Sequence, residues 1–160
     1  MAYRRRGLFR SSLLWPDTDG MTDLVDRVLT LWTAPVDGHD VRAGFASLYT
    51  DPVTVNGIDL SVDDLLARAR ALHAAFSGLR AELLQVITGD SSVAVAFVMH
   101  GQHTGTYAGP FGPVARTGVH VRIRTIDVLT LTDGRVSAIW VNADDLGLLR
   151  QLGVAPPGPA

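Results

Sequence analysis

The chain has 160 residues, of which 47% are hydrophobic and 19% are charged, as is typical of one globular domain with an adequate core. It contains no cysteine, and all 14 basic residues are arginines, so disulfides, thiolate metal sites, a cysteine nucleophile and lysine chemistry are excluded. Residues 1–20 carry four arginines against two aspartates, whereas residues 21–160 carry ten arginines against fourteen acidic residues. Residues 21–160 therefore carry a net negative charge that disfavours binding to polyanions, and we expect no nucleic-acid partner.

The two ends of the chain differ in composition from the rest. Residues 1–20 are rich in arginine, but their apolar stretch SSLLW is too short for an export signal and no A-x-A cleavage pattern follows. We interpret them as an N-terminal extension and expect a cytoplasmic protein. Residues 154–160 hold three prolines and are expected to form an irregular tail. No apolar run is long enough to cross a membrane, so we expect no membrane partner. The predicted domain consists of residues 21–153, between the extension and the tail.

Three helices are predicted in the first half of this domain. Apolar residues recur at helical spacing over residues 22–33, with Thr22 as N-cap, and again over 41–49. A third helix begins after the N-cap Ser61, has acidic residues in its first turn and ends at Gly78. The sequence DPVTVNG, before this third helix, predicts a brief strand and a turn.

From residue 80 onward the apolar residues alternate, which is the period of a β-strand. Strands are predicted over residues 81–88, 91–105, 118–132 and 134–143, and the Gly-Asp and Asp-Gly pairs mark hairpin turns. A turn and a short helix, LGLLRQLG, follow the last strand. Long adjacent strands after helices predict an α+β fold, with a curved, mostly antiparallel sheet and the helices packed on one face. Strong bending of the sheet would leave a cone-shaped cavity.

Alternation along the last two strands places two carboxylates among apolar side chains. Asp127 shares a face with Val121, Ile123 and Leu129. Asp144 continues the face of the last strand that carries Val136, Ala138, Trp140 and Asn142. Unless a bulge intervenes, both carboxylates point inward. An apolar environment raises the pKa of a carboxyl group toward the range useful for proton transfer at neutral pH.

Each of these aspartates also has a structural interpretation. Asp144 precedes an apolar helical run, where aspartate is a common N-cap. A bulge, or an ion pair with Arg122 or Arg124, would make Asp127 a structural residue. The residues alone leave these alternatives open.

The histidines do not predict a metal site. His100 and His103 are three positions apart in a segment rich in glycine, and no third ligand has the spacing to join them, so we expect no metal. A histidine in such a strand-to-loop segment is most often a hydrogen-bonding residue. His73 lies beside the apolar face of the third helix and is expected to pack there.

A series of motifs runs through the second half of the chain. GQHTGTYAGPFGPVARTG (101–118) is followed by IDVLTL, the turn DGRV, Trp140 four residues before Asp144, and LGLLRQLG. The order G-x-H-x-G, I-D, D-G-K/R-I/V, W-x-x-x-D and Q-L-G resembles that of the SnoaL-like polyketide cyclases, in the nuclear-transport-factor-2-like superfamily. The resemblance covers about residues 22–153. Two positions depart from the family pattern: Thr130, where arginine is common, and Val119, in place of the arginine of T-G-R.

The resemblance implies a cone-shaped α+β barrel with a deep apolar pocket, no cofactor and a homodimer. In the cyclases an aspartate is the acid/base for an intramolecular aldol ring closure, a role that falls on Asp144, with Asp127 as the other candidate. His103 or Asn56 would donate a hydrogen bond to the developing oxyanion. The expected ligand is a hydrophobic polycyclic or polyketide molecule, and the expected pocket residues also include Trp140, Phe76, His100, Tyr107, Phe111 and Met99. The superfamily also contains isomerases, epoxide hydrolases, hydroxylases and binding modules, and a pericyclic ring closure is a further alternative.

One face of the strand predicted over 118–132 is too apolar to be left exposed to water and too charged to lie in a hydrophobic core. This face consists of His120, Arg122, Arg124, Ile126, Val128 and Thr130. A hydrophobic centre with an arginine rim suits a subunit interface. The alternative is that a helix or the N-terminal extension covers this face within one chain.

Overall fold

The computed structural model describes residues 18–154 as four helices and eight strands. The helices are α1 (Thr18–Thr33), α2 (Val41–Leu48), α3 (Val62–Ala75) and α4 (Asp145–Gln151). The strands are β1 (Tyr49–Val55), β2 (Ile58–Leu60), β3 (Phe76–Thr88), β4 (Ser92–His103), β5 (Tyr107–Gly109), β6 (Gly112–Val114), β7 (His120–Thr132) and β8 (Arg135–Ala143). Residues 1–17 and 155–160, which include most of the predicted extension and tail, lie outside the described residues.

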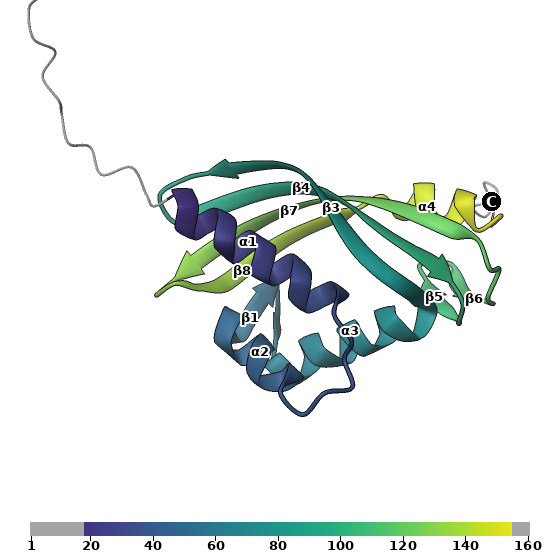
Figure 1. Ribbon diagram of the computed structural model, residues 1–160, viewed down its shortest axis with the longest axis horizontal. Coiled ribbons are helices and arrows are strands. Elements are labelled where there is room, and N and C mark those ends of the chain that lie inside the picture. Colours follow the sequence, from purple (N-terminus) through teal and green to yellow (C-terminus); the bar gives the residue numbers. More distant parts are fainter. Residues whose placement is uncertain (1–17, 155–160) are drawn as a thin grey trace, which may run out of the picture.

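Six strands form one curved sheet in the order β2-β1-β8-β7-β4-β3, and β5 pairs with β6 as a separate hairpin. All neighbours in the large sheet are antiparallel except β1 and β8, which are parallel. Figure 1 shows α1, α2 and α3 together on the concave side of the sheet, and α4 near the end that carries β5 and β6. The α+β prediction with three N-terminal helices is confirmed, but the sheet is open rather than closed into a barrel.

Local sequence signals explain most of the element boundaries. Ser61 and Asp64 form the capping box that begins α3. The hairpin between β7 and β8 turns at Asp133 and Gly134, whose φ angles of 50° and 74° suit a two-residue turn with an Asp-Gly sequence. Two boundaries differ from the prediction: α1 begins at Thr18, so Thr22 lies inside the helix, and α3 ends before Phe76.

Phe76 belongs to β3 because its backbone pairs with His103 at the end of β4. This pairing starts the strand two residues before Gly78, the glycine that predicted the end of the helix. The side chain of Phe76 is fully buried and faces the concave side of the sheet.

The core lies between the concave face of the sheet and the three helices. Phe45, from α2, is central to it: its ring stacks on Tyr49 at 6.0 Å and meets the edge of Trp32 at 5.4 Å. These three aromatic side chains join α1, α2 and β1. Within residues 18–154, no helix combines the length and the apolar character that a membrane span requires.

Candidate functional site

An irregularity in β8 decides which side chains reach the interior. Thr130 and Leu131, adjacent in β7, pair with Ala138 and Val136, which leaves Ser137 as an extra residue in β8. A β-bulge of this kind reverses the alternation of side chains beyond it.

Because of the bulge, the predicted inward orientation of Asp144 is wrong. Beyond it, Ile139, Val141 and Ala143 face the concave side, whereas Trp140 lies on the convex face with 63% of its surface exposed. Asp144 lies beyond Ala143 and lines a groove outside the inner cavity. The structure therefore separates the two carboxylates that simple alternation brings together.

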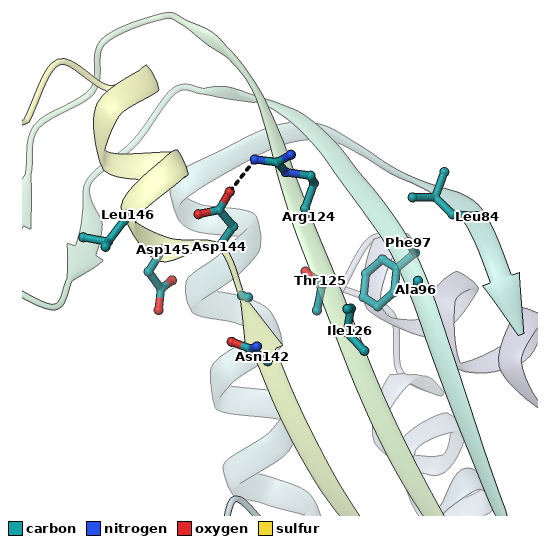
Figure 2. A pocket seen from close by; sticks show the side chains of 11 residues that line it. Leu84, Ala96, Phe97, Arg124, Thr125, Ile126, Asn142, Asp144, Asp145 and Leu146 are labelled. Carbon is teal, nitrogen blue, oxygen red and sulfur yellow. Dashed lines mark hydrogen bonds and ion pairs between the residues drawn. The ribbon is translucent and has the colours of Figure 1, made fainter. Parts of the chain in front are cut away.

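Asp144 caps α4, as its structural interpretation predicts. Its Oδ1 accepts a hydrogen bond from the backbone N–H of Gly147 at 2.8 Å, and its Oδ2 accepts one from Arg124 at 3.0 Å. The Gly147 N–H and the Arg124 guanidinium hold the pKa of Asp144 below its usual value. Figure 2 shows this pair joined by a dashed line, with Asn142 and Leu146 nearby. The four side chains line an open groove of about 500 Å³. Asp144 thus caps α4, and its lowered pKa keeps the carboxyl group ionised at neutral pH.

The same cap gives a stability prediction. A Cβ atom at position 147 would collide with the Asp144 carboxylate, so Gly147→Ala should displace the cap and lower the free energy of unfolding by about 1–2 kcal/mol. Denaturant unfolding measures the change. Alanine is otherwise the better helix former, so a Gly147→Ala variant more stable than the wild type would contradict this account of the cap.

The apolar cavity lies between the concave face of the sheet and the helices, and it shares Phe97, Thr125, Ala143 and Asp145 with the wall of the groove. It has a volume of about 270 Å³. Its walls come from α1, α3, α4 and all the long strands of the sheet, and the apolar lining includes Val28, Leu29, Leu72, Phe97, Ile123, Leu129, Ile139 and Leu148. A cavity of this character binds an apolar molecule and orients it through few polar groups.

Asp127, near the middle of β7, is one of two carboxyl groups in the wall of this cavity; the other is Asp145, at the start of α4. Its Oδ1 is buried and has no hydrogen-bond partner. Burial among apolar side chains raises the pKa of Asp127 to about 7. Neither Arg122 nor Arg124 pairs with it, since both lie on the opposite face of the strand. The group can hold a proton or accept one near neutral pH, which is what a general acid/base requires.

Four further polar side chains of the cavity were not predicted as site residues: Tyr49, Trp32, Thr125 and Asp145. Tyr49 is almost fully buried at the start of β1, and its hydroxyl accepts a hydrogen bond of 2.8 Å from the indole N–H of Trp32. Both residues line the cavity with Asp127. Their helical spacing identified them as core positions, and that pattern carries no signal for the hydrogen bond between them.

His103 lies behind the cavity wall rather than in it. Its ring is fully buried and packs against Phe76 at 5.3 Å. Its Nδ1 accepts a hydrogen bond from the backbone N–H of Thr117, and burial lowers the pKa of the ring. Gly105, two residues on, donates its N–H to the carbonyl of Ala75. The G-x-H-x-G segment thus ties the end of β4 to the junction of α3 and β3.

The remaining predicted pocket residues divide into two groups. Phe76, Met99 and Tyr107 line the cavity. Asn56, His100, Trp140 and Phe111 lie outside it.

Each residue outside the cavity has a physical reason for its place. The side-chain amide of Asn56 donates a hydrogen bond to the carbonyl of Val141 and accepts one from its backbone N–H, which extends the pairing of β1 with β8. His100 points to the convex face, where its Nε2 lies 2.7 Å from Glu82. Phe111 is half exposed in the turn between β5 and β6. Among residues 18–154, no three His, Asp or Glu side chains gather in a way that could hold a metal ion.

Solved structures with the same fold include several bacterial proteins. A proposed SnoaL-like polyketide cyclase from Jannaschia sp. CCS1 is 22% identical, with a TM-score of 0.73 over 89% of this chain and 97% of that one. IdmH, a proposed polyketide cyclase from Streptomyces antibioticus, is 19% identical, with a TM-score of 0.67 over 83% and 98%. AclR, a proposed hydroxylase from Streptomyces galilaeus, is 22% identical, with a TM-score of 0.65 over 85% and 99%.

These identities are low, so the likeness shows a shared fold and no more. No curated protein is significantly similar to this chain in sequence. The sequence model of the SnoaL-like polyketide cyclase family matches residues 22–152. This range includes every residue that lines the cavity. The chain therefore belongs to the SnoaL-like polyketide cyclase family.

Proposed function

We propose that the protein is a cofactor-independent acid/base enzyme that closes a ring within a polyketide-type carbonyl compound, with Asp127 moving the proton. One observation carries the proposal: a carboxyl group with a pKa of about 7 and an unpartnered oxygen lies in the wall of an apolar cavity. Family membership supports the reaction class, and the position of Asp127 supports the choice of base.

The proposed reaction is an intramolecular aldol addition. The Asp127 carboxylate takes a proton from a carbon next to a carbonyl group, and the electron pair of the broken C–H bond forms an enolate. The enolate carbon then bonds to a second carbonyl carbon of the same molecule, whose oxygen becomes an alkoxide. The alkoxide takes the proton back from Asp127, so the product is an isomer of the substrate and no oxidant or reductant is needed.

The cavity contributes to this reaction by confinement. Ring closure requires the two reacting carbons to be held close together, and a concave apolar wall favours folded conformers and limits their contact with water. The cavity wall is mostly aliphatic and aromatic, so shape rather than charge would orient the chain.

A direct test uses a simple triketone in which a methyl ketone side chain can close onto a cyclohexanedione ring. The protein should accelerate formation of the bicyclic aldol product above the rate in buffer, as followed by NMR or chromatography. Binding of the triketone without any acceleration would indicate a binding module instead of an enzyme, and would contradict the proposal.

We also propose that a second copy of the chain covers the convex face of the sheet. Val128 pairs with Trp140 across β7 and β8, and Ile126 lies two residues from Val128 on the same face. Their exposed fractions are 38%, 63% and 55%. Figure 1 shows α1, α2 and α3 on the opposite, concave side of the sheet, which supports this proposal. Adjacent exposed apolar side chains beside arginines suit a two-fold interface.

The proposed dimer predicts how a charge introduced into the interface would change the oligomeric state. Val128→Glu would bury an unpaired carboxylate in the interface and should convert the protein to a monomer at micromolar concentration, as measured by sedimentation or light scattering. Val119→Glu is the matched control, because Val119 is equally exposed, at 39%, but lies before β7 and away from Trp140. A wild-type monomer, or equal loss of dimer in both variants, would contradict this interface.

A further inference from the structure

Tyr49 and Asp127 share the cavity but differ in protonation. Burial and the nearby Asp127 charge raise the pKa of Tyr49 well above its usual value, so its hydroxyl keeps its proton at neutral pH. Asp127, in contrast, can hold or release a proton in that range. The cavity therefore contains a hydrogen-bond donor, Tyr49, and a group that can exchange a proton, Asp127.

The hydrogen bond from Trp32 determines what the Tyr49 hydroxyl can do. An indole N–H can only donate, so the Tyr49 oxygen accepts and its own hydrogen stays available for another acceptor. Among the described residues, the hydroxyl has no second hydrogen bond. The stacked ring of Phe45 restricts the orientation of both aromatic side chains. Accepting one hydrogen bond also makes the hydroxyl a stronger donor.

We propose that the Tyr49 hydroxyl donates a hydrogen bond to the carbonyl or enolate oxygen of the ligand, and that the ligand is a flat carbonyl compound of about two fused rings. This assignment rests on the proposed function, because the enolate formed by Asp127 is the species that the Tyr49 donor would stabilise. A neutral donor in a water-excluded site stabilises an oxyanion without reorganisation during the reaction.

The ring count follows from the volume of the cavity. An apolar cavity of about 150 Å³ accommodates one benzene ring. The cavity beside Tyr49 has about 270 Å³, a little less than twice that volume. Two fused rings, or the chain that folds into them, would therefore fill it, whereas three linear rings would extend beyond it.

Aromatic alcohols of increasing size test both parts of the proposal, because their oxygen resembles that of an enolate. The affinities of phenol, β-naphthol and anthrol are measured by fluorescence or calorimetry, together with that of naphthalene, which has no oxygen. β-Naphthol should bind most tightly of the three alcohols. Tyr49→Phe should weaken β-naphthol binding about tenfold or more, as expected for a lost hydrogen bond to a charged or strongly polar oxygen, and should leave naphthalene binding unchanged.

Tyr107→Phe compares the second tyrosine hydroxyl of the cavity, which lies 3.5 Å from Asp145. A loss of β-naphthol affinity in Tyr107→Phe but not in Tyr49→Phe would assign the oxygen site to Tyr107 instead. Unchanged naphthalene affinity shows that the cavity of each variant is intact. Equal β-naphthol affinity in the wild type and Tyr49→Phe would overturn the Tyr49 assignment, and tighter binding of anthrol would overturn the ring count. The triketone reaction is a separate readout: if it fails while Tyr49→Phe still weakens β-naphthol binding, the proposed function is wrong but the oxygen site stands.

Discussion

Replacing Asp127 with Asn is expected to slow ring closure of the triketone by about 10²–10⁴-fold, the usual contribution of a positioned general acid/base. Asparagine has nearly the shape of aspartate, so the cavity should remain intact, but the amide cannot accept the proton. The loss should appear mainly in kcat, because the apolar wall that binds the substrate does not change.

Asp144→Asn is the matched control for this experiment. Asparagine caps a helix as well as aspartate does, and Asp144 lies in the convex-face groove with Arg124 rather than in the cavity. We expect a folded protein with a rate close to that of the wild type. Loss of most activity in Asp144→Asn, together with a nearly unchanged rate in Asp127→Asn, would show that Asp144 is the base and that this assignment is wrong.

The free energy of unfolding of the wild type should fall by a few kcal/mol between about pH 4 and pH 8 because of Asp127. Folding raises its pKa to about 7, whereas an aspartate in an unfolded chain titrates near 3.9. Between these values the folded state binds more protons, so the stabilisation is fully present below about pH 4 and is lost as the pH rises through about 7. Denaturant unfolding at a series of pH values gives the curve.

The Asp127→Asn variant lacks this titration, so the difference between the two curves reports Asp127. His103, whose lowered pKa adds stability as the pH rises toward about 6.5, contributes to both curves. Asp63, Asp64, Glu82 and Asp144 have lowered pKa values, so the stability they contribute is present above about pH 4 and is lost at lower pH. They do not titrate in the window where Asp127 does. Parallel curves for the wild type and Asp127→Asn between about pH 5 and pH 8 would contradict the raised pKa of the Asp127 carboxyl group.

The orientation of Asp127 could be predicted from the sequence because β7 is regular along β4. The pairing runs without a shift from Ser92 opposite Thr130 to Gln102 opposite His120. Simple alternation therefore places Asp127 with Ile123 and Leu129, as the structure confirms. The turns between β3 and β4 and between β7 and β8 were also predictable, because the Gly-Asp and Asp-Gly pairs are local signals. The hairpin of β5 and β6 was not predicted.

The orientation of Asp144 could not be predicted in this way, because it depends on one extra residue in β8. Nothing in RVSAIWVNA marks Ser137 as a bulge: both Val136 and Ile139 are good strand residues, and the bulge is what buries them both. The W-x-x-x-D motif spans the segment after the bulge, so Trp140 and Asp144 both lie outside the cavity.

The polar groups of the cavity depend on contacts between distant elements. Trp32 and Tyr49 come from α1 and from the start of β1, and their hydrogen bond forms only when the helices pack on the sheet. The sequence predicted both as apolar-face residues, which is correct for their rings but does not reveal the hydroxyl. Likewise, the burial of His103 depends on Phe76, whose strand begins earlier than the glycine pattern indicates.

The central claim is that Asp127 is a buried carboxyl group able to exchange a proton near neutral pH. NMR titration of its carboxyl carbon tests this directly, with the signal assigned by its absence in Asp127→Asn. The account predicts a midpoint near pH 7, well above that of the other aspartates. A midpoint near the ordinary aspartate value of about 3.9 would contradict it.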